Sequence, residues 1–210
     1  MTLLETPPVK EAFKKLMKAK IVDYWEKKLR LEASLLPSLK FFHPEFHSLV
    51  SPHRLLSSAG PKPYEVAKAR IQLLFLGSQY PSGNRTKHWS YDNPAGLCTF
   101  PPCLDQCLVE SNEHILIHCP AYKTARENMF TLSIKVNCPV SRSLILGILL
   151  SASEQLMMQF LLDCSSIPEV IHAATNYSEA VYNNIFYISR TWCFTIHKER
   201  MKRLCKWNFR

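Results

Sequence analysis

Glycine is scarce in this chain, as are long apolar runs and acidic side chains. Five glycines stand against fourteen prolines among 210 residues, a ratio that disfavours glycine-rich β-hairpins and favours helices that end at prolines. No run of eighteen apolar residues exists, and the apolar segment Leu144–Leu150 is too short to span a membrane. Asp and Glu number 17 against 26 Lys and Arg, a balance that favours negatively charged partners.

The remaining composition is typical of a folded chain, with 47% hydrophobic and 20% charged residues. We expect a mainly α, helical assembly with little or no β structure. Three segments are expected: residues 1–60 as a basic helix with a proline-rich connector, residues 61–135 as a helix followed by a Cys/His segment, and residues 136–210 as a helical subdomain that ends in a basic helix.

Apolar periodicity predicts the individual helices. The first begins after Thr6 and runs to about Leu35 as a basic amphipathic helix, with Phe13, Met17 and Ile21 among its apolar positions. Further helices are expected from Pro63 to Gly77, from Pro120, and over 141–150, 153–164, 167–175 and 177–206. In the last of these, five apolar positions predict one buried stripe: Val181, Ile185, Ile188, Trp192 and Ile196.

Four cysteines and two histidines lie between positions 98 and 119, in the run CTFPPCLDQCLVESNEHILIHC. Zinc prefers four Cys or His ligands, which a short segment supplies most easily as two close pairs. Cys98 and Cys103 bracket Phe100-Pro101-Pro102, a stretch that we expect to be a non-helical loop. His114 and Cys119 lie five residues apart on an expected helical turn that stops at Pro120.

Cys98, Cys103, His114 and Cys119 are therefore the first candidate ligands of one structural Zn²⁺ per chain. Cys107 in place of Cys98, and His118 in place of Cys119, are alternatives that the spacing also permits. The remaining cysteines are interpreted as free buried thiols: Cys138, Cys164, Cys193 and Cys205. Disulfides are disfavoured because no apolar signal stretch opens the sequence, which favours an intracellular location, nuclear or cytoplasmic.

Basic side chains cluster in three places. Eight lie between Lys10 and Arg30, and seven lie between Arg190 and Arg210, where Glu199 is the only acid. A polar loop after Gly77 mixes cations with aromatics, a combination that holds single-stranded nucleic acid by charge and stacking. The predicted nucleic-acid contacts are Arg85, Lys87, Trp89, Arg190, Lys198, Lys202, Arg203 and Lys206.

Several segments together resemble the region after the reverse transcriptase domain of non-long-terminal-repeat (LINE-type) retrotransposons. They are RTKHWSYDNPAGLC at 85–98, EHILIHCPAYKTAR at 113–126, QFLLDCSSIPEVI at 159–171 and SRTWCFTIHKER at 189–200. The most specific element is Glu-His followed by an apolar run, Cys-Pro and the downstream Arg126. The resemblance implies a zinc-knuckle-like segment with Cys98, Cys103, His114 and Cys119 as ligands, in a region that binds template RNA or target DNA.

Polymerase chemistry requires paired carboxylates that hold two divalent ions, and no Asp-Asp pair in a strand-turn-strand pattern is present. The function expected from the sequence is therefore a non-catalytic module that binds RNA or single-stranded DNA. The alternative is a helical module that docks on a reverse transcriptase body.

Overall fold

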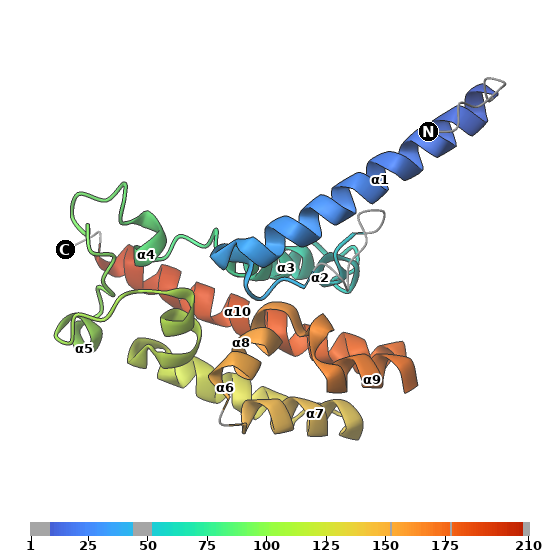
Figure 1. Cartoon of the computed structure of the whole chain (residues 1–210). Helices are drawn as coiled ribbons and strands as arrows, with labels where there is room; N and C mark the ends of the chain where they lie inside the picture. The colour runs from blue at the N-terminus through green and yellow to red at the C-terminus, as the bar shows by residue number, and fades with distance from the viewer. Residues whose placement is uncertain (1–8, 44–51, 152, 177, 208–210) are drawn as a thin grey trace.

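The computed structural model describes residues 9–43, 52–151, 153–176 and 178–207, and their architecture is almost entirely helical (Figure 1). The mainly α fold expected from the sequence is confirmed. The longer helices are α1 (Lys10–Leu35), α3 (Pro63–Leu76), α6 (Lys123–Ile134), α7 (Pro139–Leu149), α8 (Glu154–Asp163), α9 (Pro168–Asn176) and α10 (Glu179–Trp207). The short elements are α2 (Arg54–Ser57), α4 (Gly83–Thr86), α5 (Pro101–Leu104), the 3-10 turns η1 (Pro37–Leu39), η4 (Pro120–Tyr122) and η5 (Cys164–Ser166), and the π turn η3 (His114–His118).

Local sequence accounts for where the helices begin and end. Pro63 and Pro139 occupy the first turns of α3 and α7, where a missing N–H costs nothing. The Ser153 side chain caps α8 by accepting a hydrogen bond from the backbone N–H of Leu156. Gly77 ends α3, as predicted. Within the described ranges the β structure amounts to one antiparallel bridge between Leu97 and Val109.

The long helix α10 runs through the centre of the body and packs on α3, α6, α7, α8 and α9 (Figure 1). Its predicted stripe is buried at every position: Val181, Ile185, Ile188, Trp192 and Ile196. The helices α3 and α10, which the sequence division placed in different segments, pack directly against each other. Buried side chains from 61–135 and from 136–210 thus belong to one core.

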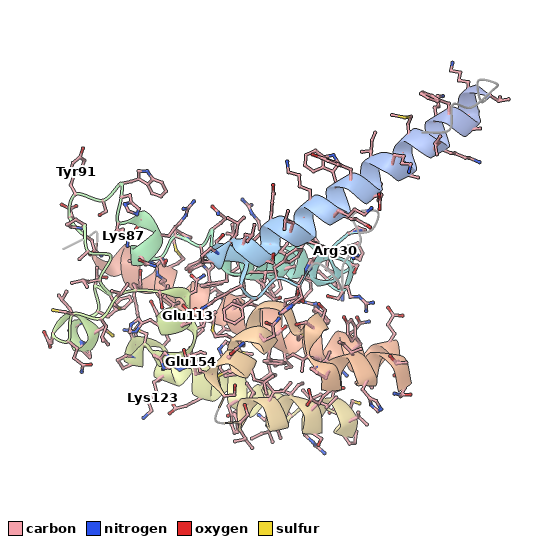
Figure 2. All side chains as sticks on the ribbon, in the orientation of Figure 1. Arg30, Lys87, Tyr91, Glu113, Lys123 and Glu154 are labelled. Carbon is pink, nitrogen blue, oxygen red and sulfur yellow. The ribbon has the colours of Figure 1, made fainter. Side chains whose placement is uncertain are left out.

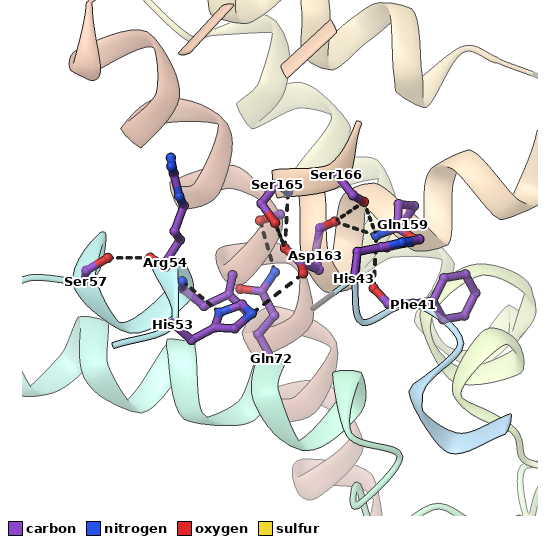
Figure 3. A network of polar contacts seen from close by, with 12 residues as sticks. Phe41, His43, His53, Arg54, Ser57, Gln72, Gln159, Asp163, Ser165 and Ser166 are labelled. Atoms are coloured by element: carbon purple, nitrogen blue, oxygen red, sulfur yellow. Dashed lines mark hydrogen bonds and ion pairs between the residues drawn. The ribbon is translucent and has the colours of Figure 1, made fainter. Parts of the chain in front are cut away.

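A buried polar network ties the segment before α3 to α8 (Figure 3). The carboxylate of Asp163 is fully buried, accepts hydrogen bonds from the backbone N–H and hydroxyl of Ser165, and lies 3.6 Å from His53 Nε2. The Gln159 amide donates to the carbonyl of Phe41 at 3.0 Å and to Ser166 Oγ at 2.8 Å. These contacts hold the connector against the core, because breaking them would leave buried polar groups unsatisfied.

Helix α1 extends away from this body (Figure 1). Of its residues only Ala33, near its C-terminal end, is buried. The expected start of this helix at Thr6 lies outside the described residues, and α1 begins at Lys10 without a side-chain cap. None of the described helices is both long and apolar enough to cross a membrane.

Candidate metal centre and basic end

Cys98, Cys103, His114 and Cys119 converge on one point in the structure. All four side chains are buried, and one ligand atom from each lies within 4.8 Å of the others. Cys98 comes from the segment before α5, Cys103 from α5, His114 from η3, and Cys119 from the junction of η3 and η4. The first of the candidate ligand sets is therefore the one that the fold assembles.

The sulfur separations fit a tetrahedral ion. A zinc–sulfur bond of about 2.3 Å implies a sulfur–sulfur edge of about 3.8 Å in a regular tetrahedron. The Cys98 and Cys119 sulfurs are 3.9 Å apart, and those of Cys103 and Cys119 are 3.7 Å apart. His114 Nε2 is buried and has no hydrogen-bond partner among the described residues. A metal ion at this point supplies the contact that such a buried ring nitrogen otherwise lacks.

Two turns bring the ligands together. Pro101–Leu104 forms the short helix α5, so the expectation that Phe100-Pro101-Pro102 is non-helical was wrong in part. Both prolines stand in the first turn, where their missing N–H groups are tolerated, and the turn carries Cys103 back toward Cys98. On the other side, the Cys119 N–H donates to the His114 carbonyl at 2.6 Å, which closes the π turn and places both ligands on one side.

The alternative ligands lie elsewhere. Cys107 is exposed and adopts a left-handed backbone conformation with φ of 51°. His118 is half exposed, and its Nε2 lies 3.0 Å from Glu154 Oε1. Outside the cluster, Cys164 and Cys193 are buried as interpreted, but Cys138 is only partly buried and Cys205 is exposed, so the interpretation as buried thiols was wrong for Cys205. In the sequence, Cys205 lies between the basic residues Arg203 and Lys206.

The surroundings of the cluster favour a bound cation. The neighbouring Cys119 thiol and burial raise the pKa of the Cys98 thiol to about 12, and burial also raises the pKa of Cys103. Thiols crowded in this way become thiolates when a metal ion takes the place of their protons. Three thiolates, one neutral imidazole and Zn²⁺ carry a net charge of −1. The half-buried guanidinium of Arg126 interacts electrostatically with Cys119, and burial lowers its pKa.

A buried ion pair connects α10 to residues 98–119, which carry the candidate ligands and which we call the metal segment. Arg200 donates from Nε to Glu110 Oε1 at 3.1 Å and from Nη2 to Glu110 Oε2 at 2.8 Å, and both side chains are buried. The same carboxylate accepts a hydrogen bond from the backbone N–H of Gly83. Glu110 also pairs through its own backbone, from its N–H to the carbonyl of Gly96 at 2.8 Å. One side chain thus joins α4, the metal segment and α10.

The close approach of two glycines makes that junction possible. Gly96 has φ of +67°, a conformation that favours glycine, and a Cβ there would lie 2.8 Å from the carbonyl oxygen of Gly83. A Cβ on Gly83 would lie 2.9 Å from the carbonyl oxygen of Gly96. The scarce glycines of this chain are therefore used, in part, where two backbones touch.

Three predicted nucleic-acid contacts lie on the loop that follows α3. Arg85 and Trp89 are exposed, with the guanidinium of Arg85 5.3 Å from the centroid of the Trp89 ring, and Lys87 is half buried. Figure 2 shows Lys87 and Tyr91 at the end of the molecule opposite to the tip of α1. Tyr91 is fully exposed.

The last turns of α10 come to the same end, beside α4 and α5 (Figure 1). Lys198, Lys202 and Arg203 are exposed there, and the Arg203 guanidinium lies 5.7 Å from the centroid of the Phe100 ring. The side chain of Lys206 lies outside the described part of the structure. We call Lys198, Lys202 and Arg203, together with Arg85 and Lys87, the basic end. The two groups lie more than 100 positions apart in the sequence, and the fold brings them to the same end of the molecule.

Arg190 does not belong to the basic end. It is buried, its Nε donates to Glu65 Oε2 at 3.0 Å, and its Nη1 donates to Ser58 Oγ at 3.0 Å. The prediction of Arg190 as a phosphate contact was wrong, because this guanidinium is buried and already pairs with the partly buried carboxylate of Glu65. Arg190 lies three residues before the buried Cys193 and therefore on the inner face of α10, which the buried stripe defines.

Sequence reasoning missed the residues that hold the site in place. Glu110 and Arg200 lie 90 positions apart, and no local pattern connects them. Lys40 and Glu113 pair at 2.6 Å and tie the connector to η3, again across a long separation. Lys40 and backbone donors lower the pKa of Glu113 despite the opposing effect of burial. Arg126 was the one such residue with a sequence signal, as part of the resemblance to retrotransposon proteins.

Comparisons of this chain with protein-family models, with curated proteins and with solved structures gave no match. The site itself therefore carries the functional argument.

Proposed function

We propose that this chain is a zinc-stabilised helical module that binds RNA or single-stranded DNA without catalysing a reaction. The observation that carries the proposal is the position of the metal cluster between two groups of cations. The cluster holds the segment that joins the Arg85 loop to the core, and the Glu110–Arg200 pair anchors the same segment on α10. Zinc binding would therefore keep the basic end in one arrangement.

The donor set favours zinc in a structural role. Three thiolates and one imidazole match structural zinc sites in ligand type and number, and four protein ligands leave no open position for a catalytic water. Cys98, Cys103, His114 and Cys119 would hold the ion, with Arg126 offsetting the net negative charge. The scarcity of paired carboxylates adds to this reasoning, since polymerases and nucleases need them.

The similarity of four segments to the region after the polymerase of LINE-type retrotransposons agrees with such a role. In that setting the module would bind template RNA or target DNA beside a polymerase. Exposed aromatic side chains at Trp89 and Tyr91 would stack on bases, while the cations contact phosphates. The proposed salt-sensitive binding of single-stranded nucleic acid does not depend on the resemblance.

Zinc is tested by metal analysis of the purified protein. We expect about one zinc per chain, and loss of that zinc with a cooperative loss of helicity in Cys119→Ser. Cys107→Ser is the matched control, because Cys107 is an exposed thiol of the same segment. A Cys119→Ser protein that keeps both zinc and native circular dichroism would refute the assignment.

Nucleic-acid binding is tested with a labelled single-stranded RNA oligonucleotide and zinc-loaded protein. If all five cations of the basic end contact phosphates, the log of affinity should fall with the log of salt with a slope of about −3.5, at roughly 0.7 per contact on a single strand. Lys198→Glu combined with Lys202→Glu should abolish retention. Lys10→Glu combined with Lys15→Glu makes the same change in net charge on α1 and should leave retention nearly unchanged. Equal loss in both double variants would mean that the attraction is not located at the basic end.

A second candidate function is docking on a larger protein body. The observation that favours it is the exposure of large apolar side chains along α1, which the other described residues do not cover. The two functions use different surfaces, so one chain can have both.

A further inference from the structure

Helix α1 carries an uncovered apolar stripe along most of its length. Its members are exposed by 42% to 70%: Met17, Ile21, Tyr24, Leu31 and Leu35. Two other large side chains, Phe13 and Trp25, flank the stripe and are about half exposed. Among α1 residues only Ala33 is buried, so this chain's own core does not explain the apolar positions.

The spacing of the stripe is that of a coiled-coil seam. From Met17 to Leu35 the positions follow steps of four, three, four, three and four, with Lys28 as the one charged member. This is an a/d heptad pattern, narrower than the apolar face by which a helix packs on a globular core. At 1.5 Å per residue the seam is about 27 Å long, enough for a partner helix of similar length.

The charges beside the seam define the partner. α1 has eight basic and four acidic side chains, a net charge of +4. Lys20 and Lys27 lie seven residues apart along one border of the seam, and the other border carries Lys18 and Glu32, whose carboxylate lies 3.7 Å from Lys28 Nζ. Lys28 occupies a core position, where its Nζ lies 4.9 Å from the centroid of the Trp25 ring. The borders and the core position together carry four lysines against one glutamate, so a partner helix with mainly acidic borders and one acidic residue opposite Lys28 would match the lysines.

From this pattern we infer that α1 is a docking site for an acidic amphipathic helix of a partner protein, which packs along the seam from Met17 to Leu35 as a two-stranded coiled coil. The inference gives the chemistry of the partner for the second candidate function and is independent of nucleic-acid binding. A helix of this length that makes so few contacts with its own chain gains most of its stability from such packing.

A second copy of this chain fits less well. In a parallel pair of α1 helices, Lys28 of one copy would face Lys28 of the other inside the seam, and each helix would add a net charge of +4. An anionic membrane fits less well also, because a membrane-surface helix presents a wide apolar face without a lysine at its centre.

The test uses two synthetic helical peptides and the full, zinc-loaded chain. Both peptides carry Leu at the a and d positions and one Glu opposite Lys28; one has Glu at all border positions and the other has Lys. Fluorescence anisotropy of the labelled peptides measures binding. We expect the acidic peptide to bind and the basic peptide to bind at least about tenfold more weakly.

Two variants locate the binding on the seam. Ile21→Ser combined with Leu31→Ser should weaken binding of the acidic peptide by about 100-fold, since each aliphatic side chain contributes roughly tenfold. Lys20→Glu combined with Lys27→Glu should reverse the preference between the two peptides. Lys15→Glu combined with Arg30→Glu changes the net charge equally on the opposite side of α1, and it should preserve the preference. All these side chains are partly or fully exposed, so circular dichroism should stay native.

Three results would overturn the inference. The first is that both peptides bind with equal affinity, or that neither binds. The second is a dimer of the chain in analytical ultracentrifugation that Ile21→Ser with Leu31→Ser dissociates, since a second copy would then cover the seam. The third is binding of α1 to anionic vesicles that the acidic peptide does not compete away. RNA retention should be unchanged in the Ile21→Ser, Leu31→Ser variant, so failure of the docking proposal and failure of nucleic-acid binding give different results.

Discussion

Replacing Arg200 by Met tests whether the buried ion pair anchors the metal segment on α10. In the native protein both side chains are buried, and Glu110 accepts hydrogen bonds from two nitrogens of the guanidinium and from the backbone of Gly83. Arg200→Met keeps a side chain of similar length but leaves the Glu110 carboxylate buried with one remaining donor. An uncompensated buried charge of this kind costs about 3–5 kcal/mol.

A double variant separates the free-energy cost of leaving Glu110 unpaired from the net contribution of the Glu110–Arg200 pair to stability. With Glu110→Gln added to Arg200→Met, no buried charge remains, and the amide can still accept the Gly83 hydrogen bond. Replacing both members of a buried ion pair is often nearly neutral. We therefore expect the double variant to recover most of the loss, to within about 1–2 kcal/mol of the native protein.

Thermal unfolding followed by circular dichroism, with zinc present throughout, measures the effect. A loss of 1 kcal/mol lowers Tm by about 2–4 °C in a domain of this size, so Arg200→Met should lower Tm by roughly 6–20 °C. Lys198→Met, on the exposed surface of the same helix, is the matched control and should change Tm by little. If Arg200→Met costs less than about 1 kcal/mol, or if the double variant is no better than the single one, the pair is not the anchor that we describe.

Three further outcomes follow from other contacts. Arg126→Met should weaken zinc binding by about 10–100-fold in a chelator competition, because the guanidinium offsets the negative charge of the site; unchanged affinity would remove Arg126 from the site. In a urea titration, Gly96→Ala should destabilise the chain by about 1–3 kcal/mol. In the same titration Gly147→Ala, in open space within α7, should stabilise it slightly. Although burial opposes the shift, Lys68 and Arg190 lower the pKa of Glu65 below 4.5. The ionised Glu65 therefore stabilises the fold above that pH, and this contribution is lost in acid. Arg190→Met should make the loss of stability below pH 4.5 shallower.

Much of the fold could be predicted from the sequence because its signals are local. The buried stripe of α10 is a helical period in the residues from Val181 to Ile196, and α3 lies between Pro63 and Gly77, both of which mark helix ends. The candidate metal ligands could be predicted for the same reason, since two close pairs lie within 22 residues. The choice between Cys98 and Cys107 was not local, because both spacings permit a tetrahedron. The antiparallel bridge between Leu97 and Val109 decides it by holding Cys98 inward, while Cys107 lies at the exposed turn.

The errors concern side chains whose role depends on distant partners. Arg190 looks like a surface cation in a basic run, but Glu65, 125 positions away, makes it an internal one. α1 was predicted as a basic amphipathic helix, and the sequence did not say what its apolar positions contact; in the structure they are exposed. In both cases the helix is predicted correctly, but its distant partner is not. Periodicity shows which face of a helix is apolar and does not show what contacts that face.

The two surfaces of the chain differ in how they are supported, and this has a consequence for how they respond to zinc. The basic end depends on the metal cluster, on Glu110 and on Arg200, so metal removal should disturb the arrangement of its cations. The α1 seam lies at the other end of the molecule and is joined to the body mainly through η1. If the chain binds zinc and nucleic acid as proposed, zinc loss should abolish nucleic-acid binding while docking of a partner on α1 persists, so that zinc occupancy would switch one surface without the other.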